Sequence, residues 1–344
     1  MEVALNVEKA GIGSAVNSIS VARRLYESHL LDASRICTQN NAFNFLGLLD
    51  STWHSQPCML GIDEAGRGPV LGPMVYACVL CPLAKSDSLK TLGFADSKVL
   101  SEQQRERLLT EVVLKNEWIS GAVRVISPVF ISDKMLDRYK TNLNTISHDS
   151  AIELIQTVLA NGIHLTEVFV DTVGKAEHYQ AKLQVLFPTL KVCVETKADD
   201  TYPIVSAASV LAKVTRDRLL RMWPKEERGP VADDLPIGSG YPGDPLTKKY
   251  LEMCVDPIFG FPSLVRSSWS TAANLLTKHG IAVSWEDDED EEHSAPTKRP
   301  AKKLATGSGK LSEYFTPTPL AHRRYAVRRA YFVRSSMTHV DSLC

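Results

Sequence analysis

The chain has 344 residues, of which 44% are hydrophobic and 23% are charged, and its formal net charge is -1. This composition is typical of a globular protein with one large or two ordinary domains, and it excludes nucleic-acid binding through an overall basic charge. No apolar run approaches the roughly 20 residues that span a bilayer, so we expect no membrane segment. Seven scattered cysteines without a signal peptide favour a reducing, intracellular compartment over a disulfide framework.

Residues 1–57 contain helical patches but no dense apolar periodicity, and we expect them to form a variable N-terminal extension. They combine Arg23 and Arg24 with several acids, which leaves organelle import as a minor alternative. One folded domain is predicted over residues 58–279. Residues 280–344 are first acidic and then basic, with few apolar side chains, and this composition predicts a disordered tail.

Strand-like and helix-like runs alternate through the predicted domain. Strands are expected at 60–63 and 73–81, and a helix follows that Ser101 opens with Gln104 in capping-box spacing. Further strands are expected at 118–126, 166–171 and 191–196, and further helices from Ser127 and at 144–160, 175–187 and 203–223. Cys78 and Cys81 lie within a strand-like run and are expected to be buried thiols rather than zinc or redox ligands. The alternation predicts an α/β domain with a mixed sheet flanked by helices.

Four acids end or follow strand-like runs: Asp63, Glu64, Asp171 and Asp199. Carboxylates gathered at strand ends can hold two Mg²⁺ ions about 4 Å apart, the arrangement that hydrolyses phosphodiesters. A single acid in such a position is more often a cap or a turn residue, and only the four acids together indicate a metal site. Because neighbouring residues of a strand point to opposite faces, we expect the strand to break at or just after Asp63.

A glycine loop follows the first two acids at once. Gly66 and Gly68 let the backbone approach a ligand closely, and Arg67 between them offers a guanidinium fork for phosphate. A bare Gly-x-Gly would be weak evidence, but its place beside paired acids at a strand end favours a binding function.

A series of short motifs continues along the domain. The series comprises Gly61-Ile62-Asp63-Glu64-Ala65-Gly66-Arg67-Gly68-Pro69, Ala95-Asp96-Ser97-Lys98, Asn142-Leu143-Asn144, Val170-Asp171-Thr172-Val173-Gly174, Lys197-Ala198-Asp199, Tyr202-Pro203, Gly238-Ser239-Gly240-Tyr241-Pro242 and Phe259-Gly260-Phe261-Pro262. In order and content, over about residues 60–278, it resembles the type 2 ribonuclease H family (ribonuclease HII), in particular the catalytic subunit of its eukaryotic form.

The resemblance implies a ribonuclease H-like fold with a C-terminal helical part before the tail. It implies that the four acids bind two Mg²⁺ or Mn²⁺ ions and that the enzyme hydrolyses RNA in RNA:DNA hybrids. It also implies cleavage 5′ of single ribonucleotides in duplex DNA, with 3′-hydroxyl and 5′-phosphate products, and a role in DNA replication and ribonucleotide removal.

The resemblance further assigns substrate contacts. Gly66, Arg67 and Gly68 correspond to the loop that reads the ribose 2′-hydroxyl, the group by which RNA differs from DNA. Lys98 matches a phosphate-contacting lysine, and Tyr241 matches a tyrosine that packs on the neighbouring deoxyribose. Taken alone, Lys98 would be read as a surface lysine and Tyr241 as a turn aromatic. The eukaryotic character implies two accessory subunits in a heterotrimer.

Alternatives stay open at three points. Asp200 directly follows Asp199, so the two could share the metal role. A catalytically silent scaffold that binds hybrids would keep the loop but lose acids, and all four acids are present. A structure-specific DNA nuclease on the same fold would lack the loop that reads the 2′-hydroxyl.

The tail carries two short signals. A basic cluster predicts nuclear import, with a weak phosphate contact or a solvated linker as alternatives; its residues are Lys298, Arg299, Lys302 and Lys303. Leu311, Tyr314 and Phe315 have the spacing of a sliding-clamp-binding peptide, although Ser308 replaces the usual leading glutamine. Nonspecific tail aromatics are the alternative.

Overall fold

The computed structural model describes residues 26–35, 37, 42–46, 55–94, 100–172, 174–229 and 236–282. Lys98, the basic cluster at 298–303 and the predicted clamp peptide at 311–315 lie outside these ranges, as does the tail after residue 282. No helix in the described ranges is long and apolar enough to cross a membrane.

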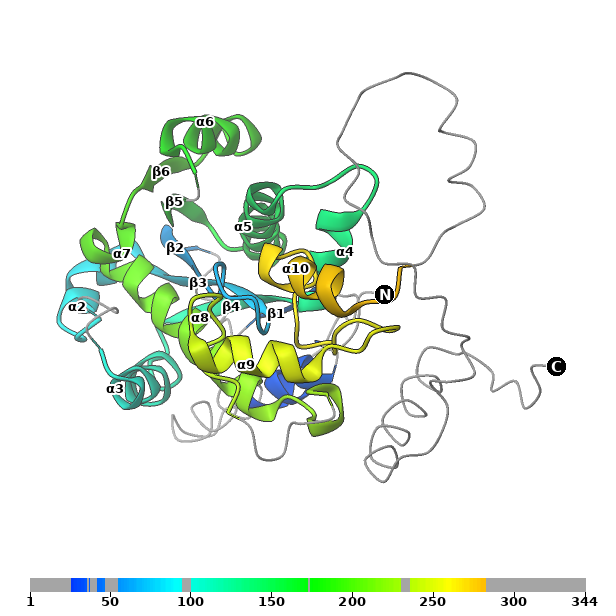
Figure 1. Cartoon of the computed structure of the whole chain (residues 1–344). Helices are drawn as coiled ribbons and strands as arrows, with labels where there is room; N and C mark the ends of the chain where they lie inside the picture. Colours follow the sequence, from blue (N-terminus) through cyan, green and yellow to red (C-terminus); the bar gives the residue numbers. More distant parts are fainter. Residues whose placement is uncertain are drawn as a thin grey trace, which may run out of the picture.

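A mixed, six-stranded sheet forms the centre of the molecule (Figure 1), in the order β1-β4-β3-β2-β5-β6. Its strands are β1 (Ala42–Leu46), β2 (Cys58–Ala65), β3 (Met74–Pro82), β4 (Ser120–Ile126), β5 (Leu165–Asp171) and β6 (Lys191–Glu195). The first four in the sheet order pair antiparallel, whereas β2 with β5 and β5 with β6 pair parallel. The prediction of a mixed sheet is confirmed.

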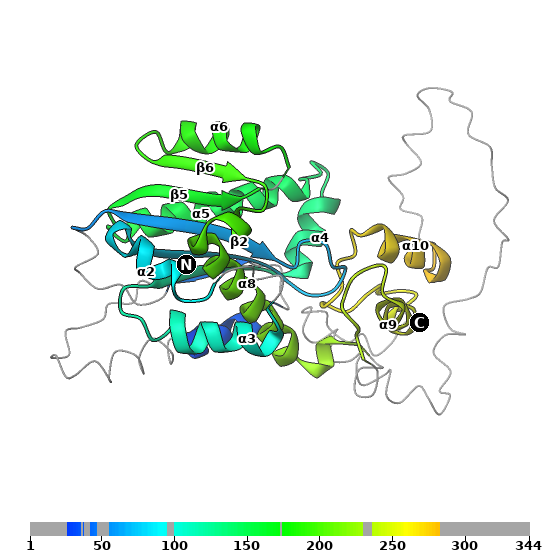
Figure 2. The same ribbon diagram turned by 90° about the vertical axis from the view of Figure 1, so that its left-hand side faces the viewer.

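Helices cover both faces of this sheet and continue beyond one end of it. They are α2 (Ser86–Lys90), α3 (Glu102–Arg107), α4 (Pro128–Leu136), α5 (Leu143–Ala160), α6 (Ala176–Leu186), α7 (Ala198–Thr201), α8 (Pro203–Met222), α9 (Pro245–Cys254) and α10 (Ser270–His279). The predicted starts hold, since Ser101 caps α3 in a capping box with Gln104 and Ser127 caps α4. Figure 2 shows α9 and α10 beyond the end of the sheet toward which β2 points.

Two apolar cores lie on opposite faces of the sheet. One packs β2, β3 and β4 against α8, and the other packs β2, β3 and β5 against α5 and α6 (Figure 1). Gly61 of β2 allows the closest approach, because a Cβ there would lie 2.4 Å from the backbone of Ile204 in α8. Cys78 and Cys81 are fully buried in β3, which agrees with their interpretation as core thiols.

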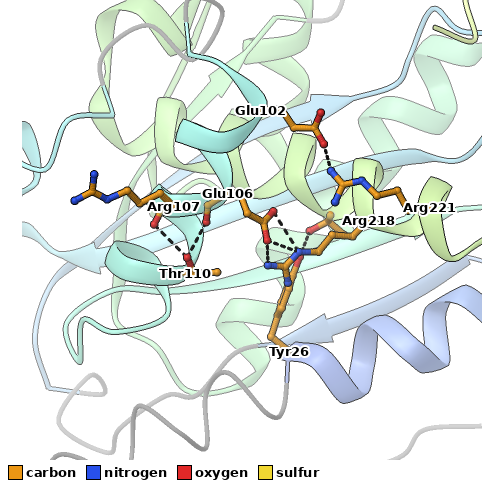
Figure 3. A network of polar contacts seen from close by, with 8 residues as sticks. Tyr26, Glu102, Glu106, Arg107, Thr110, Arg218 and Arg221 are labelled. Atoms are coloured by element: carbon orange, nitrogen blue, oxygen red, sulfur yellow. Dashed lines mark hydrogen bonds and ion pairs between the residues drawn. The ribbon is translucent and has the colours of Figure 1, made fainter. Parts of the chain in front are cut away.

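Two segments that precede residue 58 take part in the packed unit. β1 pairs with β4, and the helical residues 26–35 place Tyr26 and Leu30 in the core beside α8. The Tyr26 hydroxyl lies 2.8 Å from Thr215 Oγ1 in α8. The Arg218 guanidinium lies 5.3 Å from the Tyr26 ring centre and is paired with Glu106 of α3 (Figure 3). We therefore propose that the domain begins at or before Tyr26 rather than at residue 58.

Candidate active site

The predicted acids come together at the carboxyl ends of β2, β5 and β6. β2 and β5 run parallel with Ile62 opposite Val170, so Asp63 and Asp171 follow at the same level of the sheet. After β6, Lys197 takes a left-handed conformation (φ 58°) and starts α7, which carries Asp199. Asp171 Oδ1 accepts a hydrogen bond from the amide of Ala198 at 2.9 Å, which joins the end of β5 to α7.

Asp63 and Glu64 sit on opposite faces of one continuous strand. The predicted break after Asp63 is wrong, since β2 runs to Ala65 and Glu64 pairs with Tyr76 of β3. Asp63 is 5% exposed and hydrogen-bonds with Ser209 on the α8 side, while Glu64 lies on the other side, where its charge acts on Tyr76 and Tyr179. The predicted acids therefore lie on both faces of the sheet, near the carboxyl end of β2.

Burial and mutual repulsion perturb both acids of β2. Burial, followed by the charges of Asp171 and Asp199, raises the pKa of Asp63 to about 7, although hydrogen bonds with Ser209 and the Glu64 amide oppose the shift. Burial and the charges of Asp63, Asp171 and Asp199 raise the pKa of Glu64 to about 8, against the opposing charge of Arg67. The charges of Asp171 and Asp199 thus act on both acids of β2.

The donor set fits a hard divalent cation in chemistry and location. Glu64 Oε2 is buried and has no hydrogen-bond partner in the described part of the chain, a state that a bound cation would relieve. Within the same ranges, no three acidic, histidine or cysteine side chains are already close enough together to hold an ion. The site thus offers carboxylates from three elements, β2, β5 and α7.

The raised pKa values predict a pH dependence of the metal-free protein. The pKa rises from 3.8 to about 7 for Asp63 and from 4.5 to about 8 for Glu64, so the stability that these groups contribute is complete below about 4 and is lost progressively as the pH rises from there to about 8. We expect the thermal midpoint in chelator to fall between about pH 5 and 8, and to fall less in Asp63→Asn. Scanning calorimetry checks this, and equal slopes for both proteins would contradict it.

The glycine loop is held from inside by a fully buried arginine. Arg266 donates to the carbonyl oxygens of Gly66 at 2.5 Å, Arg67 at 3.0 Å and Gly72 at 2.9 Å. Burial and the nearby charge of Arg216 lower the pKa of Arg266 well below its usual value. The carbonyl oxygens of the loop therefore point inward, toward the Arg266 guanidinium.

A second buried arginine explains why the loop begins with glycine. Arg216 of α8 donates to Pro73 O at 3.2 Å and to Leu71 O at 3.1 Å. Gly66 has φ 78°, and a Cβ there would lie 2.1 Å from Arg216 Nε. Both the backbone conformation and the arginine therefore require glycine at this position.

The loop also carries hydrogen-bond donors, namely the Arg67 side chain and the backbone amides of residues 66–68. The Arg67 guanidinium donates to Ser147 Oγ at 2.6 Å and to Asn144 Oδ1, both in α5, which fixes its side chain beside Glu64. Within the described part of the chain, the amides of Gly66, Arg67 and Gly68 make no hydrogen bond. With carbonyls held inward, these amides are available to a ligand.

Tyr241 lies against this loop. A Cβ on Gly68 would lie 3.1 Å from the Tyr241 ring, and the ring is 53% exposed. The preceding residue, Gly240, accepts a hydrogen bond from the Val70 amide at 2.8 Å, and Trp269 Nε1 donates to Gly68 O at 3.1 Å. An exposed aromatic face thus adjoins the unpartnered amides.

Comparison with known proteins decides the family. The sequence model described as Ribonuclease HII matches residues 60–272. The chain belongs to the ribonuclease HII family. It is 50% identical over 289 residues to the A subunit of ribonuclease H2 from Homo sapiens and 48% identical over 289 residues to the one from Mus musculus, each match covering 84% of this chain and 91% of the relative.

Solved structures support the same assignment. Ribonuclease H2 from Pyrococcus horikoshii OT3 is 30% identical, with a TM-score of 0.54 over 64% of this chain and 98% of that one. Ribonuclease HII from Archaeoglobus fulgidus, solved in complex with PCNA, is 33% identical, with a TM-score of 0.53 over 67% of this chain and 99% of that one. The predicted family, the ribonuclease H fold and the enzyme class are confirmed: the protein is a ribonuclease H, a hydrolase that cuts nucleic acid.

The sequence did not point to the side chains that hold the backbone of the glycine loop in this ribonuclease HII. Arg216 and Arg266 were not singled out, and neither was Trp269. A signal existed for Arg216, because it falls on the buried stripe of α8 together with Ala212 and Leu219. Arg266 lies in an irregular segment with no periodic pattern, so its burial depends on contacts 200 positions away.

Proposed function

We propose that this ribonuclease hydrolyses RNA in RNA:DNA hybrids and cuts on the 5′ side of single ribonucleotides in duplex DNA, leaving 3′-hydroxyl and 5′-phosphate ends. One observation carries the proposal: four interacting carboxylates adjoin a loop whose carbonyls are held inward and whose amides have no partner in the described part of the chain. Cleavage and recognition of a sugar hydroxyl need these two groups side by side.

The acids supply the hydrolytic half of the site. We infer that Asp63, Glu64, Asp171 and Asp199 bind two Mg²⁺ or Mn²⁺ ions, which when bound activate a water and stabilise the leaving oxygen. The raised pKa values of Asp63 and Glu64 reflect burial first and then repulsion from the neighbouring acids, and bound cations would offset both. Asp171 is oriented by the Ala198 amide, and Asp63 by Ser209 and the Glu64 amide.

The loop supplies the recognition half. The amides of Arg67 and Gly68 are suited to donate to a 2′-hydroxyl oxygen, since that group accepts as well as donates. Arg67 is anchored to α5 with its charge beside Glu64, where a scissile phosphate would lie. The exposed Tyr241 ring next to Gly68 offers an apolar face to the neighbouring sugar.

Cleavage of matched duplexes tests the proposal. The wild-type chain is incubated with an all-DNA duplex, a duplex with one ribonucleotide and an RNA:DNA hybrid, with Mg²⁺, with Mn²⁺ and with chelator. We expect metal-dependent cutting of the last two substrates, with the product end 5′ of the ribonucleotide. Binding without cutting would favour the silent scaffold, and cutting of the all-DNA duplex would favour a structure-specific DNA nuclease; either result overturns the proposal.

Partners and location extend the proposal beyond the site. The mammalian relatives are named as A subunits of ribonuclease H2, and this supports assembly of the chain with other subunits, which we propose to be two accessory chains. The PCNA complex of the archaeal relative supports clamp binding through Leu311, Tyr314 and Phe315. Nuclear import through the basic cluster at 298–303, and a role in replication and ribonucleotide repair, are proposals that rest on the sequence.

A further inference from the structure

The loop that carries Asp199 is tied across its two ends by a pair of side chains. Glu195 is the last residue of β6, and Tyr202 is the residue before α8. The Tyr202 hydroxyl donates to Glu195 Oε1 at 2.7 Å. Between them, Lys197 has φ 58°, a conformation that residues with a side chain rarely adopt. The turn therefore depends on contacts outside its own backbone.

Both members of this pair are fixed from the sheet. The Tyr202 ring packs on Phe169 of β5 with ring centres 4.6 Å apart, and Cys193 Sγ donates to Glu195 Oε1 at 3.2 Å. Glu195 stands opposite Asp171 in the β5–β6 register, and its carbonyl accepts from the Thr172 amide at 3.0 Å. The hydrogen bond thus links the Asp199 loop to the strand that ends in Asp171.

We propose that Glu195 and Tyr202 are positioning residues, which hold the 196–201 loop so that Asp199 stays beside Asp171. The inference rests on the proposed role of these acids in metal binding. Groups that orient ligands without touching the ion commonly change metal affinity by about tenfold or more when they are removed. Neither side chain needs to contact substrate for this role.

Glu195 is also a fifth carboxylate near the site, and its charge alone could attract cations. Three variants separate charge from hydrogen bonding. Tyr202→Phe removes only the hydroxyl and keeps the Glu195 charge, Glu195→Gln removes the charge and keeps an acceptor oxygen, and Glu195→Ala removes both.

Mn²⁺ binding to the full chain without nucleic acid, measured by titration calorimetry, is the primary readout. We expect Tyr202→Phe and Glu195→Ala each to weaken binding about tenfold, and the double variant to bind no more weakly than the weaker single variant. Glu195→Gln should stay within about threefold of wild type. Thermal midpoints and cleavage of the single-ribonucleotide duplex are recorded in parallel.

The matched control lies at the other end of the same strand pair. Glu167 Oε1 of β5 pairs with Lys191 Nζ of β6 at 3.1 Å, away from the acids. Glu167→Ala removes a comparable acceptor between the same strands, and we expect Mn²⁺ affinity to be unchanged.

Three results would overturn the positioning role: wild-type affinity in Tyr202→Phe, equal loss in Glu195→Gln and Glu195→Ala, or additive losses in the double variant. If these occur while wild type binds Mn²⁺ and cuts its substrate, the proposed function stands and only the positioning role fails. A wild-type chain that neither binds Mn²⁺ nor cuts overturns the proposed function and the positioning role with it.

Discussion

Asp63→Asn is expected to slow cleavage at least about a thousandfold while affinity for an RNA:DNA hybrid stays within about twofold of wild type. The reason is that Asp63 lies near the end of β2 among acids and hydrogen-bonds with Ser209, whereas the loop that we propose to contact the sugar follows it in the chain. Single-turnover cleavage and fluorescence anisotropy measure the two quantities separately. Thermal unfolding in chelator should show no loss of stability, because the substitution removes a buried charge from a repelling cluster.

Asp200→Asn is the matched control for this result. Asp200 follows Asp199 in α7 but is exposed, whereas Asp199 is 3% exposed. We expect Asp200→Asn to keep near-wild-type cleavage, which would assign the metal role to Asp199 alone. An Asp63→Asn enzyme that cuts at more than a tenth of the wild-type rate would contradict the assignment of Asp63 to the reaction centre.

Gly66→Ala is expected to destabilise the fold by at least about 2 kcal/mol and to lower cleavage of single-ribonucleotide substrates by at least about a hundredfold. Two costs combine at this position: a positive φ of 78° and a Cβ that would lie 2.1 Å from Arg216 Nε. Relief of the overlap moves either the loop or Arg216, and each movement disturbs the amides beside Tyr241. Chemical denaturation and cleavage assays at saturating Mg²⁺ test the two expectations.

Gly93→Ala separates the two costs. Gly93 has nearly the same backbone conformation, φ 82°, but no atom of the described residues lies within 4 Å of the position that a Cβ would take. We expect it to lose only the backbone contribution, about 1 kcal/mol, with cleavage unchanged. Equal losses of stability in both variants would show that Arg216 adjusts without cost, and overlap with Arg216 would then not be a reason for glycine at position 66.

Local signals in the sequence were sufficient for the strands and helices that were predicted between residues 58 and 223. The caps at Ser101 and Ser127 and the apolar runs before Asp63 and Asp171 each depend on neighbours in the chain, and the structure has them as expected. The strand break after Asp63 was wrong because pairing of β2 with β3 continues to Ala65. Cross-strand pairing of that kind has no signature in a single strand.

Long-range contacts account for what the sequence could not predict. Tyr26 belongs to the core because its hydroxyl meets Thr215, 189 residues later, and nothing in the residues around Tyr26 points to that partner. Arg266 resembles an ordinary surface residue until the loop at 66–72 folds around its guanidinium. Buried arginines bonded only to backbone carbonyls leave no complementary acid in the sequence to search for.

The placement of Arg266 gives the two halves of the site different origins in the chain. The carboxylates are set by the sheet and α7, whereas the shape of the loop is imposed by a residue that follows α9. Synthesis from the N-terminus therefore completes all four acids before the arginine that holds the loop has been made. A chain that ends before residue 266 would keep the four acids and lose the three hydrogen bonds that Arg266 donates to the loop carbonyls.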